Sequence, residues 1–273
     1  MSYKGEIFIS VIMSVYNSEK HLRKSIESIL SQSYENFEFI IVDDFSNDSS
    51  WKIIQDYSAK DKRINAYRRE KNLGLTKNLN FMINKSKGEF IARMDSDDIS
   101  LKNRLYEQIE YMKNNPKIDI LGTASIEIDN EEKCVNIKKY PEEDFMNYIC
   151  KASPVLHPTV MLKSSVFSKL SYNEKFRTSQ DLDLWFRCLK NGYKFANINT
   201  PLLKFRMDKD FFKRRSVNKS INEFYIYITG IYSLHGISIK LIYPFFRLFF
   251  RILPQSFVSI FYKSYVRKIF LKG

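Results

Sequence analysis

The chain has 273 residues, 44% of them hydrophobic and 27% charged. This length and composition exclude a disordered chain and are typical of one sizeable α/β domain with an appendage. The three cysteines lie far apart and form no CxxC pair, which argues for a reducing compartment and against a cysteine-based metal site.

The net charge of +13 is unevenly distributed along the chain. Residues 201–273 contain 14 Lys or Arg and three acidic residues, whereas residues 1–200 contain 30 basic and 28 acidic residues. The partner of the positive charge is therefore expected to bind the C-terminal region.

Strands and helices are predicted to alternate from the N-terminus. Residues 7–16, IFISVIMSVY, form a near-continuous apolar run rich in β-branched residues, which indicates a strand buried on both faces. Apolar residues at helical spacing then predict a helix that ends near Tyr34. The same criteria predict strands at 37–42, 64–67 and 89–94 and helices at 50–59 and 75–84.

The second half of the chain is less regular. A helix is expected to open at Leu101 and close near Pro116, followed by a strand at 118–122 and a hairpin at 125–140. A later helix opens at Ser179. Its apolar positions are Leu182, Trp185, Phe186 and Leu189. Trp185 is expected to lie in the core, with an acceptor platform as the alternative.

The alternation indicates βαβ units, and hence a mostly parallel sheet flanked by helices. Ligands of such sheets bind beyond the carboxyl ends of the strands. The chain has neither GxGxxG after the first strand nor GxxxxGK[ST] anywhere, which excludes a dinucleotide fingerprint and a P-loop. A phosphate would therefore be held by metal and side chains.

Polar or acidic residues follow three of the predicted strands, and all should line one edge of the sheet. These residues are Ser14, Tyr16 and Asn17, then Asp43 and Asp44, then Asp95, Asp97 and Asp98. Three acids within four residues repel one another, so a divalent cation such as Mg²⁺ or Mn²⁺ is the simplest counter-charge. The alternative is a solvated helix start in which Asp98 or Ser100 caps the helix.

Residues 241–270 are dense in aromatic and aliphatic side chains but interrupted by Lys and Arg. The longest uncharged run, 252–262, has 11 residues, whereas a membrane-spanning helix needs about 20. The composition therefore favours a segment that lies in the headgroup region of an anionic leaflet. A core helix pair with solvated cations is the alternative, and the segment is too apolar for a nucleic-acid surface.

Six segments, taken together and in order, resemble the family 2 glycosyltransferases of the GT-A fold. They are ISVIMSVYN, IIVDDFSNDSS, EKNLGLTKNLN, GEFIARMDSDDIS, HPTVML and SQDLDLW. The likeness covers roughly residues 7–206. It implies a Rossmann-like catalytic domain over residues 1–210. The charge and aromatic density of residues 211–273 predict a basic, aromatic helical appendage that associates with a membrane.

The resemblance also implies an activity. A UDP-sugar would bind over the first four strands, and its sugar would pass with inversion to a hydroxyl of a glycan or lipid-linked acceptor, assisted by Mn²⁺ or Mg²⁺. Such an enzyme of cell-surface polysaccharide synthesis would be cytoplasmic, peripheral on the inner face of the membrane. The alternatives are a catalytically weak nucleotide-sugar-binding protein on the same scaffold and a nucleotidyltransferase.

Roles for individual residues follow only from the resemblance. Asp181 matches the family's catalytic base. The nucleotide-sugar site would comprise Ser14, Tyr16, Asn17, Asp44, Lys77, Arg93, Asp95 and Asp97, with Asp44 accepting from the uracil ring and Lys77 and Arg93 near the diphosphate. Asp95 and Asp97 would contact the metal, with Asp98 as a less certain third acid.

Two departures from the family pattern affect the site. The family's Glu-Asp pair is Gln180-Asp181 here, and Asp208 stands where many relatives carry a His. Asp208 could still bind a metal, and His157 offers a substitute ligand. The alternative for His157 is a packed histidine in a turn before Pro158.

Overall fold

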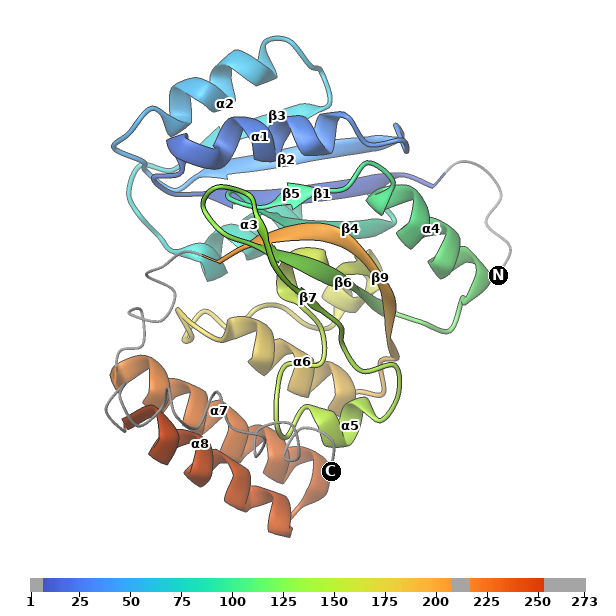
Figure 1. Ribbon diagram of the computed structural model, residues 1–273, viewed down its shortest axis with the longest axis vertical. Helices are drawn as coiled ribbons and strands as arrows, with labels where there is room; N and C mark the ends of the chain where they lie inside the picture. The colour runs from blue at the N-terminus through green and yellow to red at the C-terminus, as the bar shows by residue number, and fades with distance from the viewer. Residues whose placement is uncertain (1–6, 208–216, 253–273) are drawn as a thin grey trace.

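The computed structural model describes residues 7–207 and 217–252, with one sheet of nine strands at its centre (Figure 1). The strand order is β3-β2-β1-β4-β8-β6-β9-β5, and β7 pairs with β6. The strands are β1 (Ile9–Val15), β2 (Phe37–Asp43), β3 (Ile64–Arg68), β4 (Phe90–Asp95), β5 (Ile99–Ser100), β6 (Ile120–Ile128), β7 (Cys134–Lys138), β8 (Met161–Lys163) and β9 (Phe195–Arg206). The helices are α1 (Glu19–Leu30), α2 (Ser50–Ser58), α3 (Leu75–Lys85), α4 (Arg104–Asn114), α5 (Phe145–Tyr148), α6 (Gln180–Lys190), α7 (Val217–His235) and α8 (Tyr243–Ile252).

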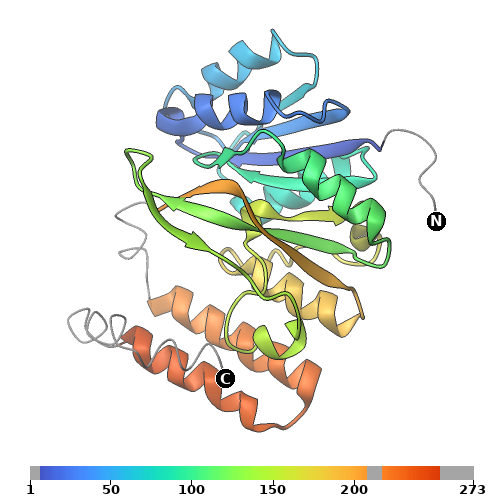
Figure 2. The ribbon, with the colours of Figure 1, turned by 45° about the vertical axis from the view of Figure 1, so that its right-hand side comes forward.

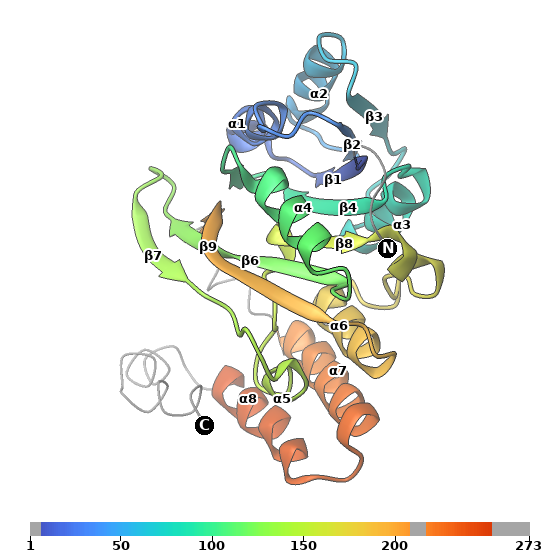
Figure 3. The ribbon, with the colours of Figure 1, turned by 90° about the vertical axis from the view of Figure 1, so that its right-hand side faces the viewer.

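The sheet is covered by helices on both faces, because its central strands are apolar on both sides. Val11 and Met13 of β1 belong to a core with α1, α2 and α4, whereas Ile12 between them belongs to a second core with α3, α6 and α7. Figure 3 shows these two layers edge on. The predicted α/β fold class is therefore confirmed.

The parallel part of the sheet is the part that the sequence pattern predicted. β3, β2, β1 and β4 are parallel to one another, and β6 pairs in parallel with β9. The other pairs are antiparallel. The hairpin at 125–140 is present as β6 and β7, which reach the upper left of Figure 2.

The start of α4 differs from the prediction. The helix begins at Arg104, and its N-cap is Asn103, which makes no side-chain capping bond. Neither Asp98 nor Ser100 caps it, because the residues after the acidic turn pair with another strand first. Ile99 and Ser100 form β5 opposite β9, and the Ser100 amide donates to Ser28 Oγ at 3.0 Å.

Three strands, β5, β8 and β9, were not predicted. The predicted strand at 118–122 continues to Ile128 as β6, and β9 pairs with β6 along almost the whole length of β6. Thr123, Ala124 and Ser125 lack the β-branched apolar pattern, yet they are buried in the sheet because β9 covers them.

The predicted C-terminal appendage is helical in the described residues. α7 packs on α6, and an added Cβ at Gly230 would lie 2.4 Å from the Phe186 ring, so the glycine permits this close approach. α8 packs on α7 and forms the outermost layer (Figures 1 and 3). Residues 253–273 of the predicted membrane segment lie outside the described residues. None of the described helices has both the length and the apolarity to cross a membrane.

Candidate active site

The three polar strand ends meet at one edge of the sheet, as predicted. In the parallel register Ser14 lies opposite Asp95 of β4, and Val15 lies opposite Asp43 of β2. The Asp44 amide donates to the Val15 carbonyl at 2.8 Å, which keeps the strand ends together for one more residue. This edge is the expected ligand side of a parallel sheet.

Three residues around this edge adopt the left-handed conformation without being glycine. Asn17 follows β1, Phe45 follows β2, and Ser179 precedes α6, with φ of 49°, 65° and 58°. Such conformations are uncommon for side chains other than Asn, Asp and Gly, and they concentrate at functional sites. Phe45 itself and Tyr16, which precedes Asn17, both have exposed side chains.

Asp44 fixes the loop before α3. Its two carboxylate oxygens accept from the backbone amides of Leu73 and Gly74, each at 2.8 Å. Ser14 accepts from Asn78 of the same helix at 3.2 Å, so the ends of β1 and β2 both hold α3 in place. Lys77 lies in the first turn of α3 and is exposed.

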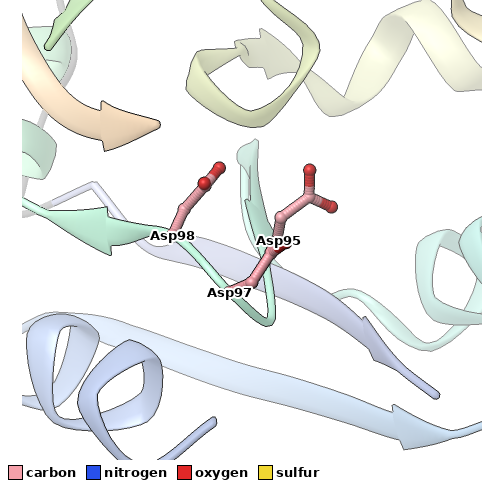
Figure 4. A group of neighbouring side chains, drawn as sticks. All are labelled: Asp95, Asp97 and Asp98. Atoms are coloured by element: carbon pink, nitrogen blue, oxygen red, sulfur yellow. The ribbon is translucent and has the colours of Figure 1, made fainter. Parts of the chain in front are cut away.

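The acidic turn between β4 and β5 brings three carboxylates together (Figure 4). Asp95, Asp97 and Asp98 each offer an oxygen within 4.8 Å of the others. Burial, with the nearby Asp95, raises the pKa of Asp97 to about 6, and burial with both neighbouring acids raises the pKa of Asp98 well above its ordinary value. A hydrogen-bonding atom of Asp98, Oδ2, is buried without a partner in the described residues.

These features fit a hard divalent cation. Carboxylate oxygens are the ligands that Mg²⁺ and Mn²⁺ prefer, and a cation would relieve the repulsion that disfavours the charged acids. Within the described part of the chain, this cluster is the one group of three or more acidic, histidine or cysteine side chains close enough together to hold a metal ion. Asp208, a predicted ligand, lies outside the described residues.

Arg206, which the sequence analysis did not single out, holds the acidic turn. Its amide donates to Asp98 Oδ1 at 2.9 Å, its Nε donates to the Asp97 carbonyl at 2.9 Å, and its Nη1 donates to the Asp129 carbonyl at 3.1 Å. Glu132 of the hairpin lies 3.6 Å from Nη2. The sequence carries no local signal for this role, because the acceptors of Arg206 come together only where the hairpin meets the acidic turn.

We expect Arg206→Met to lower the free energy of unfolding by about 2–4 kcal/mol, because it removes a buried charged donor from two partly buried carbonyls. The bond from the backbone amide to Asp98 survives the substitution, so the turn should be loosened rather than lost. Chemical denaturation of the full chain measures the effect. Lys113→Met, which removes an exposed pair with Glu110 on α4, is the control and should cost about 0.5 kcal/mol or less. Equal effects in the two variants would contradict the role of Arg206.

Arg93 of β4 lies between the acidic turn and α6. It is only 6% exposed and forms an ion pair with Asp95. Burial raises the pKa of Asp97 and of Asp181 on α6, and the charge of Arg93 opposes that rise. Burial lowers the pKa of His157, and Arg93 adds to that effect. Arg93 therefore acts electrostatically both on the acidic turn and on Asp181.

The two acids of α6 have different surroundings, as their spacing on a helix predicts. Asp183 accepts from Arg187 Nε at 2.9 Å and Nη2 at 2.7 Å, which makes it a structural partner. Burial raises the pKa of Asp181, against the opposing effect of helix amides and Arg93. A partly exposed carboxylate with a raised pKa, within the electrostatic influence of an arginine, has the properties of a general base.

His157 belongs to the core behind Asp181. It lies in a short 3-10 turn, η1 (His157–Thr159). Its Nε2 is 2.7 Å from the Tyr172 hydroxyl, and its ring packs edge-on against Trp185, which is fully buried. Burial, with Arg93, lowers the pKa of His157 well below its ordinary value. The structure does not bring His157 into the cluster of acids, and Trp185 is a core residue.

The family model described as Glycosyl transferase family 2 matches residues 10–171. Among curated relatives, an uncharacterized glycosyltransferase of Methanocaldococcus jannaschii is 40% identical over 80% of this chain and 77% of its own length. The O-antigen biosynthesis glycosyltransferase WbnJ of Escherichia coli is 35% identical, with 82% of this chain and 87% of that protein covered. A UDP-Gal:alpha-D-GlcNAc-diphosphoundecaprenol beta-1,3-galactosyltransferase of Escherichia coli is 29% identical over 95% of this chain and 96% of that protein.

Two solved structures have the same fold. TarS of S. aureus, residues 1–349 in complex with UDP-GlcNAc, superposes with a TM-score of 0.62 at 18% identity, covering 90% of this chain and 81% of that one. The mannosyltransferase PcManGT of Pyrobaculum calidifontis, in complex with GDP-Man and Mn2+, gives 0.62 at 14% identity over 92% and 71%.

Proposed function

The chain belongs to the family 2 glycosyltransferases, and on that premise we propose that it moves a sugar from a UDP-sugar to an acceptor hydroxyl with inversion at the anomeric carbon. The observation that carries the proposal is the arrangement around Arg93. Acids from a strand end and an acid from α6 lie within reach of the same guanidinium. A single displacement needs a diphosphate site and a base across the sugar from it, and this arrangement offers both.

Asp181 is proposed as the base. Its carboxylate would accept the proton of the attacking hydroxyl as the bond to the anomeric carbon forms and the bond to the diphosphate breaks. The raised pKa of Asp181 brings its basicity closer to the operating pH, which improves proton transfer. The neighbouring Asp183 is occupied by Arg187, so it would not compete for this role.

Asp95 and Asp97, with Asp98 behind them, would hold Mn²⁺ or Mg²⁺. When bound, the ion would stabilise the negative charge that develops on the leaving diphosphate. The relative PcManGT was solved with Mn2+, which supports the proposal for this chain. Arg206 keeps the turn rigid through the Asp97 carbonyl and the Asp98 carboxylate, and Arg93 supplies fixed positive charge beside it.

The nucleotide would lie over the ends of β1 and β2. Tyr16 and Ser14 would border the base beside Asn17, and Lys77 would approach the diphosphate from α3. Asp44 is proposed as the acceptor for the uracil ring. Each Asp44 oxygen already accepts one amide of the loop before α3, so the uracil bond would use a second lone pair and would couple donor binding to the order of that loop.

UDP is proposed as the carrier, with a hexose or N-acetylhexosamine, because a relative that aligns along nearly the whole chain is named for UDP-Gal. The acceptor is proposed to be a glycan or a lipid-linked sugar in polysaccharide synthesis. WbnJ is named for O-antigen biosynthesis and the galactosyltransferase for a diphosphoundecaprenol acceptor, which supports that class.

A nucleotide-sugar-binding protein without turnover is the second candidate, favoured by Gln180 in place of the family's Glu. A screen separates the two. The full chain is incubated with each UDP-sugar and with GDP-mannose, with Mn²⁺ or Mg²⁺, and nucleoside diphosphate release is measured. We expect release from one UDP-sugar class. Nucleotide binding without release from any donor would leave only the binding role, and release from GDP-mannose alone would overturn the assignment of UDP.

A further inference from the structure

The outward side of α8 is made of aromatic and aliphatic side chains. Phe245, Phe246 and Phe249 are spaced so that they share one side of α8, and Ile242 ends the short 3-10 helix η4 (Ile239–Ile242) directly before it. Their exposed fractions lie between 43% and 59%. The solvent side of a surface helix is normally polar, whereas the solvent side of α8 is apolar.

The opposite side of α8 holds the helix in this orientation. Arg247 Nε donates to Glu223 of α7 at 2.7 Å, and its Nη1 donates to the Lys151 carbonyl at 3.1 Å. Phe245, at the border of the two sides, packs edge-on against Phe224 of α7 with ring centroids 5.0 Å apart. The aromatic side therefore cannot turn inward without breaking a paired arginine and an aromatic contact.

The connection between α7 and α8 extends the apolar surface. Ile237 and Ile239 are 90% and 82% exposed, so each keeps nearly all of its side chain in water. We call Ile237, Ile239, Ile242, Phe245 and Phe246 the outer apolar face. α8, which carries Phe245 and Phe246, lies beside α7 at the end of the molecule far from β1, β2 and β3 (Figure 3). Exposed apolar side chains gathered in one short segment are typical of a binding site.

The charge of the surrounding sequence indicates what binds there. Residues 236–273 contain seven Lys or Arg and no acidic residue. Of the described cations, Lys240 donates to the Asn147 side chain and Arg247 pairs with Glu223 on the inner side of α8, so the segment acts through its net positive charge. An acid-free, cationic segment with exposed Phe and Ile is complementary to a surface that is both anionic and apolar just beneath, which is the interface of a bilayer with anionic lipids.

We propose that the outer apolar face docks the chain on the surface of an anionic lipid bilayer, with α8 parallel to the membrane plane. Phe245, Phe246 and Ile239 enter the boundary between headgroups and acyl chains, and the net positive charge of the acid-free segment favours anionic over neutral lipids. This proposal is argued from the exposed side chains of the outer apolar face and from the charge of the segment, so it does not depend on the identity of the proposed sugar donor. For a lipid-linked acceptor it would keep enzyme and acceptor in the same plane.

Vesicle sedimentation of the full chain tests the proposal. Vesicles of phosphatidylcholine with phosphatidylglycerol should pellet the protein, vesicles of phosphatidylcholine alone should pellet far less, and added salt should release it. The double variant Ile239→Asp, Phe246→Asp should reduce the bound fraction at least about tenfold, because each change places a charge in the interface.

The matched control is Val135→Asp, Ile137→Asp on β7. These side chains are 63% and 54% exposed and lie outside the outer apolar face, so this variant should bind vesicles like the unchanged chain. Thermal unfolding of every variant verifies the fold. If the first double variant is not folded, Ile237→Asp replaces it, since that side chain is 90% exposed.

Three results would overturn the proposal. The first is that the Ile239→Asp, Phe246→Asp variant binds vesicles as well as the unchanged chain, and the second is that the unchanged chain binds neutral and anionic vesicles equally. The third is that the unchanged chain binds no vesicles but forms a dimer, which the double substitution dissociates. The last result would assign the face to contact between two copies. Because the assay contains no donor, a failure of the proposed transferase activity would not affect its outcome.

Discussion

Asp181→Asn is expected to lower turnover by about 100- to 10,000-fold, the range that general-base catalysis supplies. The amide is close in shape to the carboxylate but cannot accept the proton of the attacking hydroxyl. Binding of UDP should be retained, because the strand ends of β1, β2 and β4 are unchanged. Nucleoside diphosphate release measures turnover, and calorimetry measures UDP binding.

The same substitution should not destabilise the fold. Burial raises the pKa of Asp181 above its unfolded value, so this group stabilises the folded state most at low pH, and that contribution is lost as the pH rises through the raised pKa. At neutral pH the charged Asp181 carboxylate therefore destabilises the folded state, and the uncharged amide of the variant removes this cost. The melting temperature of the variant at pH 7 should equal or exceed that of the unchanged chain.

Asp183→Asn is the matched control two residues along α6. It weakens the pair with Arg187 but leaves the proposed base, so turnover should stay within about threefold, corresponding to less than about 1 kcal/mol. If Asp181→Asn retained turnover at that level too, Asp181 would not be the base.

Asp97→Asn is expected to abolish the response of the protein to divalent metal. For the unchanged chain, Mn²⁺ at about 100 times its Kd should stabilise the folded state by about 2.7 kcal/mol. The variant loses one ligand of the acidic turn, so its melting temperature should hardly change with Mn²⁺. Its donor turnover should fall together with the metal response, since the charge on the leaving diphosphate is no longer stabilised.

Glu110→Gln on α4 controls for loss of an acid elsewhere. Glu110 pairs with Lys113 on the surface, so this variant should keep the full metal response and full turnover. A metal-induced shift in Asp97→Asn equal to that of the unchanged chain would show that the ion binds somewhere other than the acidic turn.

The first half of the fold could be predicted from the sequence because its local signals agree with its tertiary contacts. β1 and β2 are apolar on both faces and are buried on both faces, and their helices follow at regular spacing. The second half could not, because tertiary pairing overrides propensity there. Thr123 and Ala124 fall between the predicted strand and the predicted hairpin yet are buried in β6, since β9 returns from about 75 residues along the chain to pair with it.

The candidate site shows the same division. Strand-end residues such as Ser14 and Asp95 could be placed together, because parallel register brings the carboxyl ends of neighbouring strands to one edge. Arg206 could not, since its partners at Asp97, Asp98 and Asp129 depend on how the hairpin folds over the acidic turn. For His157, the packed alternative agrees with its bond to Tyr172.

The anomeric configuration of the sugar released to water tests the proposed displacement most directly. In the absence of acceptor, water takes the place of the attacking hydroxyl, and proton NMR follows the first sugar that appears from an α-linked UDP donor. One displacement assisted by Asp181 predicts that the β-anomer appears first and that Asp181→Asn does not produce it. Initial release of the α-anomer would contradict the account.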